Sequence, residues 1–130
     1  MVSESQQWLS MAEQDYSVAK HLLETFYPMP YEHICYQCQQ AAEKAIKAVI
    51  IFHGSPGGLP KKHDLSFLLQ QLCHLEHIND TLLDYADELT PYGVSVRYPN
   101  ELFLTEQHAR KALQQAKAFL DWAQGVLVSK

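Results

Sequence analysis

The stretch ICYQCQQAAEKAIKAVIIF, residues 34–52, decides the fold. Its apolar side chains recur at steps of three or four residues, which is the period of a helix and not of a strand. Gly54 lies just beyond the stretch, and glycine commonly ends helices. The pattern therefore predicts one long helix whose apolar stripe consists of Ile34, Cys38, Ala41, Ala45, Val49 and Phe52.

The same helical period appears on both sides of this stretch. Ser3 and Gln6 fit a capping box at the start of a first helix, which carries an apolar stripe from Trp8 to Phe26. Asp64 and Thr105 can each cap a later helix, because a side-chain oxygen at that position accepts from the first-turn backbone N–H groups. Helices are therefore expected along most of the chain.

The helix-breaking residues mark where the predicted helices end. All six prolines and four of the five glycines lie in three stretches, residues 28–30, 54–60 and 91–99. Residues 77–80 give a further break before a short fourth helix. We therefore predict an all-α fold, an up-and-down and mostly antiparallel bundle of four to five helices that forms a single domain over residues 1–130.

The composition excludes several classes of protein. Hydrophobic residues make up 47% and the formal net charge is −5, which excludes a largely disordered chain and a uniformly basic nucleic-acid binder. The charge is uneven, because residues 37–63 hold four lysines and one acidic residue. No apolar stretch approaches the roughly 18 residues of a membrane span, and the N-terminus lacks a secretory signature. We therefore expect a cytoplasmic protein that makes no membrane contact.

The polar side of the central predicted helix carries the first candidate site. Gln37, Gln40, Lys44 and Lys47 follow one another at steps of three and four residues, which places them on one helix face. His63 follows two lysines directly after the glycine-rich loop. Lysines on one face can contact phosphate. A solvated helix surface is the plainer interpretation.

The segment from residue 90 to residue 104 carries the second candidate site. Arg97 can hold a phosphate through two hydrogen bonds, and Tyr98 can stack on a base. In the alternative interpretation, Arg97 pairs with a carboxylate of the fourth helix and Tyr98 packs into the bundle. The pattern leaves both interpretations open.

The remaining motifs favour structural roles. Cys35 and Cys38 form a C-x-x-C pair inside a predicted helix with no preceding strand, which favours buried packing over redox chemistry. Two histidines in residues 74–77 lack the spacing of a metal site. The acidic residues of the fourth helix indicate a solvated face, with partner docking as the lesser interpretation. We expect neither a metal nor a cofactor.

Three segments together resemble the HEPN domain family (higher eukaryote and prokaryote nucleotide-binding). They are residues 38–48, CQQAAEKAIKA, then His63-Asp64-Leu65, then Arg97-Tyr98-Pro99, and the resemblance covers nearly the whole chain. It implies a helical bundle that commonly forms a homodimer. It also implies a gene encoded beside a minimal nucleotidyltransferase, with the HEPN protein as its nucleotide-binding partner or as half of a toxin–antitoxin pair. The residues that match the family are Gln40, Lys44, Lys47, His63, Asp64, Arg97 and Tyr98.

The resemblance also bears on catalysis. Many HEPN proteins are metal-independent ribonucleases with an arginine followed, after four to six residues, by a histidine. Here ten residues separate Arg97 from His108, so we favour a protein that is not an enzyme. The alternatives are a ribonuclease that uses Arg97 with His108 or His63, and a purely structural interaction protein or antitoxin. We expect a module that binds a nucleotide or RNA phosphate through Gln40, Lys44, Lys47, His63, Arg97 and Tyr98 and that partners a minimal nucleotidyltransferase.

Overall fold

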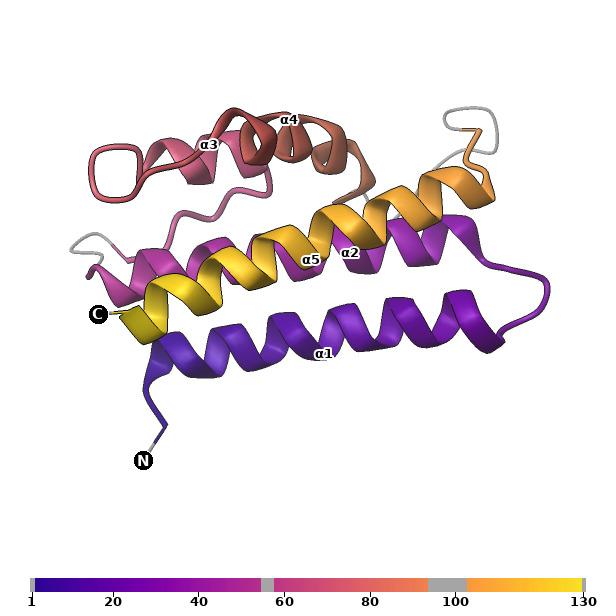
Figure 1. Ribbon diagram of the computed structural model, residues 1–130, viewed down its shortest axis with the longest axis horizontal. Coiled ribbons are helices and arrows are strands. Elements are labelled where there is room, and N and C mark those ends of the chain that lie inside the picture. The colour runs from indigo at the N-terminus through magenta and orange to yellow at the C-terminus, as the bar shows by residue number, and fades with distance from the viewer. Residues whose placement is uncertain (1, 55–57, 94–102, 130) are drawn as a thin grey trace.

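The structure is a computed structural model that describes residues 2–54, 58–93 and 103–129. Within these ranges the chain forms five α-helices and one short 3₁₀ helix, with no strand (Figure 1). The predicted all-α bundle is confirmed. The helices are α1 (Glu4–Thr25), α2 (Tyr31–Phe52), α3 (Leu65–Gln70), α4 (Asp80–Leu89), η1 (Thr90–Gly93) and α5 (Glu106–Ser129).

The long helix α2 lies at the centre of the bundle, between α1 and α5 on one side and α3 and α4 on the other (Figure 1). Its alanines let the neighbouring helices approach closely, and Ala41, Ala42, Ala45 and Ala48 are completely buried. The prediction of a buried stripe along this helix is confirmed, with Phe52 only half-buried at its end.

The direction of α5 is set by the two short helices. α1 runs antiparallel to α2, whereas α5 runs in the same direction as α2 because α3 and α4 carry the chain back along the bundle (Figure 1). The start of α1 and the ends of α2 and α5 therefore meet at one end of the molecule, where Ser5, Phe52 and Leu127 line a common hollow.

The helix starts follow the predicted caps. The Ser3 Oγ accepts from the backbone N–H of Gln6 at 3.2 Å, and the Asp64 Oδ1 accepts from that of Phe67 at 3.2 Å. The Thr105 Oγ1 accepts from the N–H of His108 at 3.4 Å. Each cap satisfies a donor that the first helical turn leaves unpaired.

The two cysteines of the C-x-x-C pair are completely buried in α2. Burial, together with the nearby Cys35, raises the pKa of the Cys38 thiol far above its ordinary value. A thiol held in its protonated form is a poor nucleophile and a poor metal ligand. The geometry therefore agrees with the packing role that the sequence favoured for this pair.

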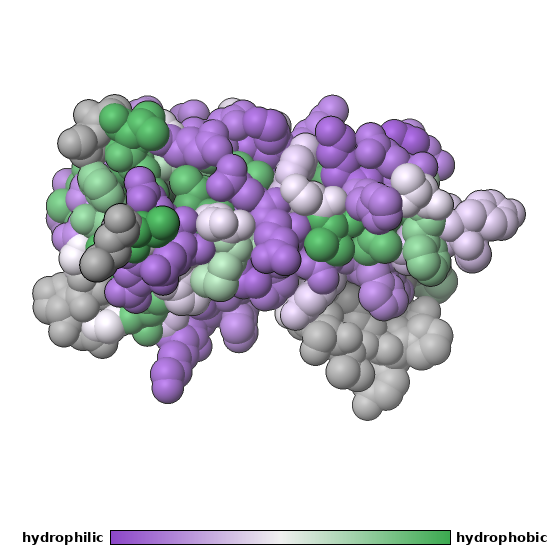
Figure 2. Space-filling view, turned by 90° about the horizontal axis from the view of Figure 1, so that it is seen from below, coloured by the Kyte–Doolittle hydropathy of each residue, from purple (hydrophilic) through white to green (hydrophobic). Residues whose placement is uncertain are grey.

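Figure 2 shows the face on the α1 side, which is largely hydrophilic along its middle and more hydrophobic toward the ends. Among the exposed apolar side chains of α1 are Met11 and Val18, two turns apart. Over the described ranges, none of the helices combines the length and the apolarity needed to cross a bilayer.

Candidate functional site

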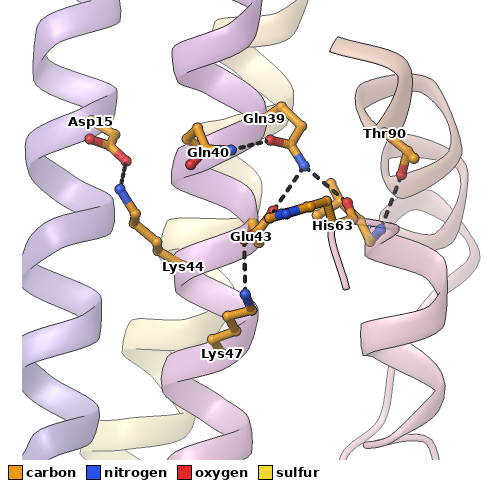
Figure 3. A network of polar contacts seen from close by, with 9 residues as sticks. Asp15, Gln39, Gln40, Glu43, Lys44, Lys47, His63 and Thr90 are labelled. Carbon is orange, nitrogen blue, oxygen red and sulfur yellow. Dashed lines mark hydrogen bonds and ion pairs between the residues drawn. The ribbon is translucent and has the colours of Figure 1, made fainter. Parts of the chain in front are cut away.

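A buried carboxylate on α2 organises the polar side of the bundle. Glu43 is only 4% exposed. The Lys47 Nζ, one turn later, donates to the Glu43 Oε2 at 2.9 Å, and the Gln39 Nε2, one turn earlier, donates to Oε1 at 3.3 Å (Figure 3). Because these three residues follow at steps of four, one helix face brings them together.

His63 reaches the same carboxylate from the segment between α2 and α3. Its Nδ1 lies 2.9 Å from the Glu43 Oε1, and its backbone carbonyl accepts from the Gln39 Nε2 at 3.0 Å (Figure 3). The His63 side chain is nevertheless 72% exposed. With Nδ1 directed at the carboxylate, the ring presents its Nε2 edge to solvent.

The charge of Glu43 is maintained by its neighbours. Burial raises the pKa of this carboxyl, but hydrogen bonds from Lys47, His63 and Gln39, together with the Lys47 charge, outweigh burial and hold the pKa below its ordinary value. A buried carboxylate is tolerated when paired and hydrogen-bonded in this way. Glu43 therefore stays ionised and fixes the orientation of His63.

The 3₁₀ helix η1 closes the network from the other side. A Cβ atom on Gly93 would lie 2.8 Å from the Gln39 Cδ, so a larger residue at this position would force the Gln39 amide to shift. The Thr90 hydroxyl accepts from the Leu65 N–H at 3.1 Å (Figure 3). It also donates to the Ala86 carbonyl at 2.7 Å. These contacts join η1 to both α3 and α4.

Lys44 and Lys47, predicted to share an accessible face, both have carboxylate partners within the bundle. The Lys44 Nζ lies 2.6 Å from the Asp15 Oδ2 on α1, away from His63 (Figure 3). The Lys47 Nζ also lies 5.9 Å from the Trp8 ring centroid, within cation–π range. Neither the phosphate interpretation nor the solvated one foresaw these intramolecular pairs.

The structure brings together only some of the predicted site residues. Gln40 joins the network by donating to the Gln39 Oε1 at 2.8 Å, beside Lys47 and His63. Lys44 lies in a separate ion pair. Arg97 and Tyr98 lie outside the residues that the structure describes.

Sequence reasoning missed Gln39 and Glu43. Their signal was present, because residues 39, 43 and 47 are polar and follow one another at steps of four along the predicted helix. A glutamate four residues before a lysine is the favoured orientation of a helical ion pair. The stripe that we selected instead consists of Gln37, Gln40, Lys44 and Lys47, and it shares only Lys47 with this face.

A protein-family model described as the HEPN domain matches residues 5–126. The chain belongs to the HEPN domain family.

Solved structures similar to this HEPN chain share its fold. A protein of Thermus thermophilus superposes with a TM-score of 0.84 at 24% identity, over 96% of this chain and 99% of that one. An archaeal HEPN homologue gives a TM-score of 0.73 at 27% identity, over 95% and 98% of the two chains. Both comparisons cover nearly the whole of this chain.

A curated relative comes from Methanocaldococcus jannaschii, where it carries the name of a putative toxin. It is 28% identical over 139 residues, which span 95% of this HEPN chain and 88% of that protein. The similarity thus extends over nearly the full length of both chains.

Two exposed cations of this HEPN chain lie beside the network. Lys61 and Lys62 directly precede His63, and both are exposed. Neither ammonium has a carboxylate within 4.0 Å in the part of the chain that the structure describes. The Lys62 Nζ lies 5.7 Å from the Phe67 ring centroid. This arrangement can bind an anion from solvent.

The second histidine considered for catalysis has a structural partner. The His108 Nδ1 accepts from the Thr105 backbone N–H at 3.1 Å, while the Thr105 Oγ1 accepts from the His108 N–H. This reciprocal pair is a capping box in which histidine replaces the usual glutamate. His108 therefore stabilises the start of α5.

Proposed function

We propose that this HEPN-family chain is a toxin-like protein that binds a nucleotide or RNA phosphate at the surface around His63. The observation that carries the proposal is the exposed His63 ring, held through Nδ1 by the buried Glu43 and directly preceded by Lys61 and Lys62. The toxin-like role is supported by the relative from Methanocaldococcus jannaschii.

The electrostatics of this surface suit an anion. Lys61 and Lys62 supply positive charge, and the His63 Nε2 edge can donate a hydrogen bond to a phosphate oxygen. Lys47 contributes indirectly, because it neutralises Glu43 and so reduces the repulsion that this carboxylate would exert on a phosphate. We retain Arg97 and Tyr98 as further ligand-binding residues of the proposal. Lys44 and Gln40 then support the bundle beside the site.

Calorimetric titration of the protein with ATP, with GTP and with a short single-stranded RNA tests the site. We expect His63→Ala to weaken binding about tenfold, because a hydrogen bond to a charged group is lost. The matched control is His74→Ala, an exposed histidine away from the network. Absence of binding by the wild type would overturn the function, whereas equal binding by His63→Ala would overturn only the site.

The two lysines give a second, independent measurement. Phosphate binding by lysines releases counterions, so affinity for RNA falls as salt rises. We expect the double variant Lys61→Ala/Lys62→Ala to bind RNA more weakly and with a shallower salt dependence.

Incubation of the same RNA with the protein in EDTA tests the ribonuclease alternative. The RNA should stay intact. Cleavage that His63→Ala abolishes would favour the ribonuclease alternative.

We also propose that the protein forms a homodimer and acts with a minimal nucleotidyltransferase. The support is the resemblance of its sequence to HEPN proteins encoded beside such enzymes. Co-expression with the product of the neighbouring gene, followed by size-exclusion chromatography, tests the partnership. A neighbouring gene of another kind, or separate elution of the two proteins, would contradict it.

A further inference from the structure

The contact between Glu43 and His63 determines which ring nitrogen of the imidazole carries the proton. The neighbours of Glu43 hold the pKa of this carboxyl below its ordinary value, so it is ionised and can only accept hydrogen bonds. The proton in the 2.9 Å contact between the Glu43 Oε1 and the His63 Nδ1 therefore belongs to Nδ1. The neutral ring of His63 then has its lone pair on Nε2.

This Nε2 atom is accessible from solvent. The His63 side chain is 72% exposed, although its Nδ1 is directed at a carboxylate that is itself buried (Figure 3). The protonated ring donates a hydrogen bond through Nε2, which is the form used in the proposed phosphate site. The neutral ring instead presents an unshared electron pair there, and a histidine nitrogen in this state is a nucleophile.

Two other histidines of the chain do not offer Nε2 in this way. His108 is exposed, but its Nδ1 accepts from the Thr105 backbone N–H at 3.1 Å, so its neutral ring carries the proton on Nε2. The Nε2 of His53 already contacts the Glu76 Oε2 at 2.7 Å, and this side chain is only 18% exposed. The orientation of His63 is therefore a particular feature of its contact with Glu43.

The charges around His63 suit attack on an anionic electrophile. Lys61 and Lys62 directly precede it, and their positive charge attracts anions. When the ring attacks, it gains positive charge, and a carboxylate bonded to the other ring nitrogen stabilises that charge. A phosphoryl group combines negative charge with an electrophilic phosphorus atom, so it matches both parts of this site.

We infer that the His63 Nε2 accepts a phosphoryl group from a small phosphoryl donor of the acyl phosphate or phosphoramidate class. Nε2 attacks the phosphorus atom and forms an N–P bond. The bond from phosphorus to the leaving group breaks, and its electron pair stays with that group. Nδ1 keeps its proton, and Glu43 balances the positive charge of the ring. The inference uses the same side chain as the proposed function but requires no binding of a nucleotide or RNA.

Reaction of the folded protein with potassium phosphoramidate at about pH 8, where histidine rings are mostly neutral, tests the inference. Mass spectrometry of peptides kept at alkaline pH measures each histidine separately, because phosphohistidine hydrolyses in acid. We expect His63 to react at least about tenfold faster than the exposed His74, which lacks a carboxylate on its ring. Equal rates at the two histidines would overturn the inference.

The nitrogen that reacts gives a second readout. NMR of the ¹⁵N-labelled imidazole rings distinguishes Nδ1 from Nε2. We expect the unmodified His63 to carry its proton on Nδ1, and the modified ring to carry phosphorus on Nε2. A phosphoryl group on Nδ1 would contradict the inference, because Glu43 occupies that side of the ring.

A pair of variants tests the contribution of the carboxylate. Glu43→Gln removes the charge beside the ring and should slow phosphorylation of His63 about tenfold, with no effect at His74. The matched control, Glu106→Gln, removes an exposed carboxylate that is paired with Arg110 and should leave both rates unchanged. Equal rates at His63 in the two variants would show that Glu43 does not activate the ring. If Glu43→Gln does not fold, the rates of His63 and His74 in the wild type decide.

The outcomes separate this inference from the proposed function. Selective phosphorylation of His63 in a protein that binds neither ATP, GTP nor RNA would leave the inference standing and remove the proposed function. Binding of one of these ligands through His63, without selective phosphorylation, would do the reverse.

Discussion

Glu43 concentrates the polar interactions of the bundle on one side chain. Glu43→Gln keeps the size of this side chain but removes its charge, which leaves the Lys47 ammonium buried without its counter-ion. We expect a loss of about 3 kcal/mol in the free energy of unfolding, the usual consequence of breaking a buried pair from one side. Urea unfolding followed by circular dichroism measures it.

An exposed ion pair of the same spacing gives the control for Glu43→Gln. Glu106 and Arg110 also lie four residues apart on a helix, but both side chains are more than half exposed. Glu106→Gln should change the free energy of unfolding by less than about 0.5 kcal/mol, because solvent screens exposed pairs. Similar losses in the two variants would contradict the central role of Glu43.

At the residue scale, the sequence showed which residues are polar but not which partners their side chains would contact. Three of the residues selected on α2, Gln40, Lys44 and Lys47, make polar contacts within the bundle. The helical period alone could not tell which of its cations would find a carboxylate, because Asp15 approaches Lys44 only through the packing of α1 on α2. His63 was predicted from its neighbours, and its orientation depends on Glu43, twenty residues earlier in the chain.

At the element scale, the packing of η1 against α2 depends on Gly93, which has no side chain to collide with Gln39. Gly93→Ala would place a Cβ atom 2.8 Å from the Gln39 Cδ. The Gln39 amide is already held by hydrogen bonds, which oppose the shift that this contact requires. We expect a loss of about 1 to 3 kcal/mol in stability, as for overpacking in a well-filled core. Thermal unfolding of the variant measures this loss.

At a second glycine, Gly125, replacement by alanine is expected to raise the stability instead of lowering it. Gly125 lies within α5, and a Cβ atom there would meet nothing within 4 Å. Gly125→Ala should therefore raise the stability by about 0.5 to 1 kcal/mol, because alanine favours the helix and loses less entropy on folding. Destabilisation by both variants would show that the contact with Gln39 is not the cause.

The helices themselves could be read from the sequence because their causes are local. The period of the apolar residues and the clusters of glycine and proline indicate where helices lie and end. The caps mark where they begin, at Ser3, Asp64 and Thr105. The path of the chain could not be predicted in this way, because the direction of α5 depends on how α3 and α4 pack. That packing is a tertiary effect that no local pattern contains.

For the whole molecule, Glu43 makes stability depend on pH. Its pKa in the folded protein is below that of the unfolded chain, so its contribution is present above the unfolded value and is lost as pH falls through the folded value. The difference in unfolding free energy between wild type and Glu43→Gln should therefore shrink from pH 7 to about pH 3.5. Urea unfolding at a series of pH values checks this, and parallel curves for the two proteins would contradict it.

The proposed homodimer concerns the α1 side of the molecule. Met11 and Val18 are 39% and 41% exposed and lie two turns apart on one face of α1. We expect sedimentation at micromolar concentration to give twice the 14.9 kDa mass of the chain, and Val18→Asp to give the monomer. Leu75→Asp, at an exposed position away from α1, should remain dimeric. A wild-type monomer would remove the proposal.

The convergence of Gln39, Lys47 and His63 on Glu43 also restricts how this sequence can change over evolution. Loss of Glu43 or Lys47 alone leaves an uncompensated buried charge, whereas joint replacement of the two by apolar residues of similar volume is often neutral or even stabilising. The effects of substitutions at these positions are therefore expected to be strongly epistatic. A descendant that lost this network would be expected to exchange several of its members together, with each single step passing through a less stable protein.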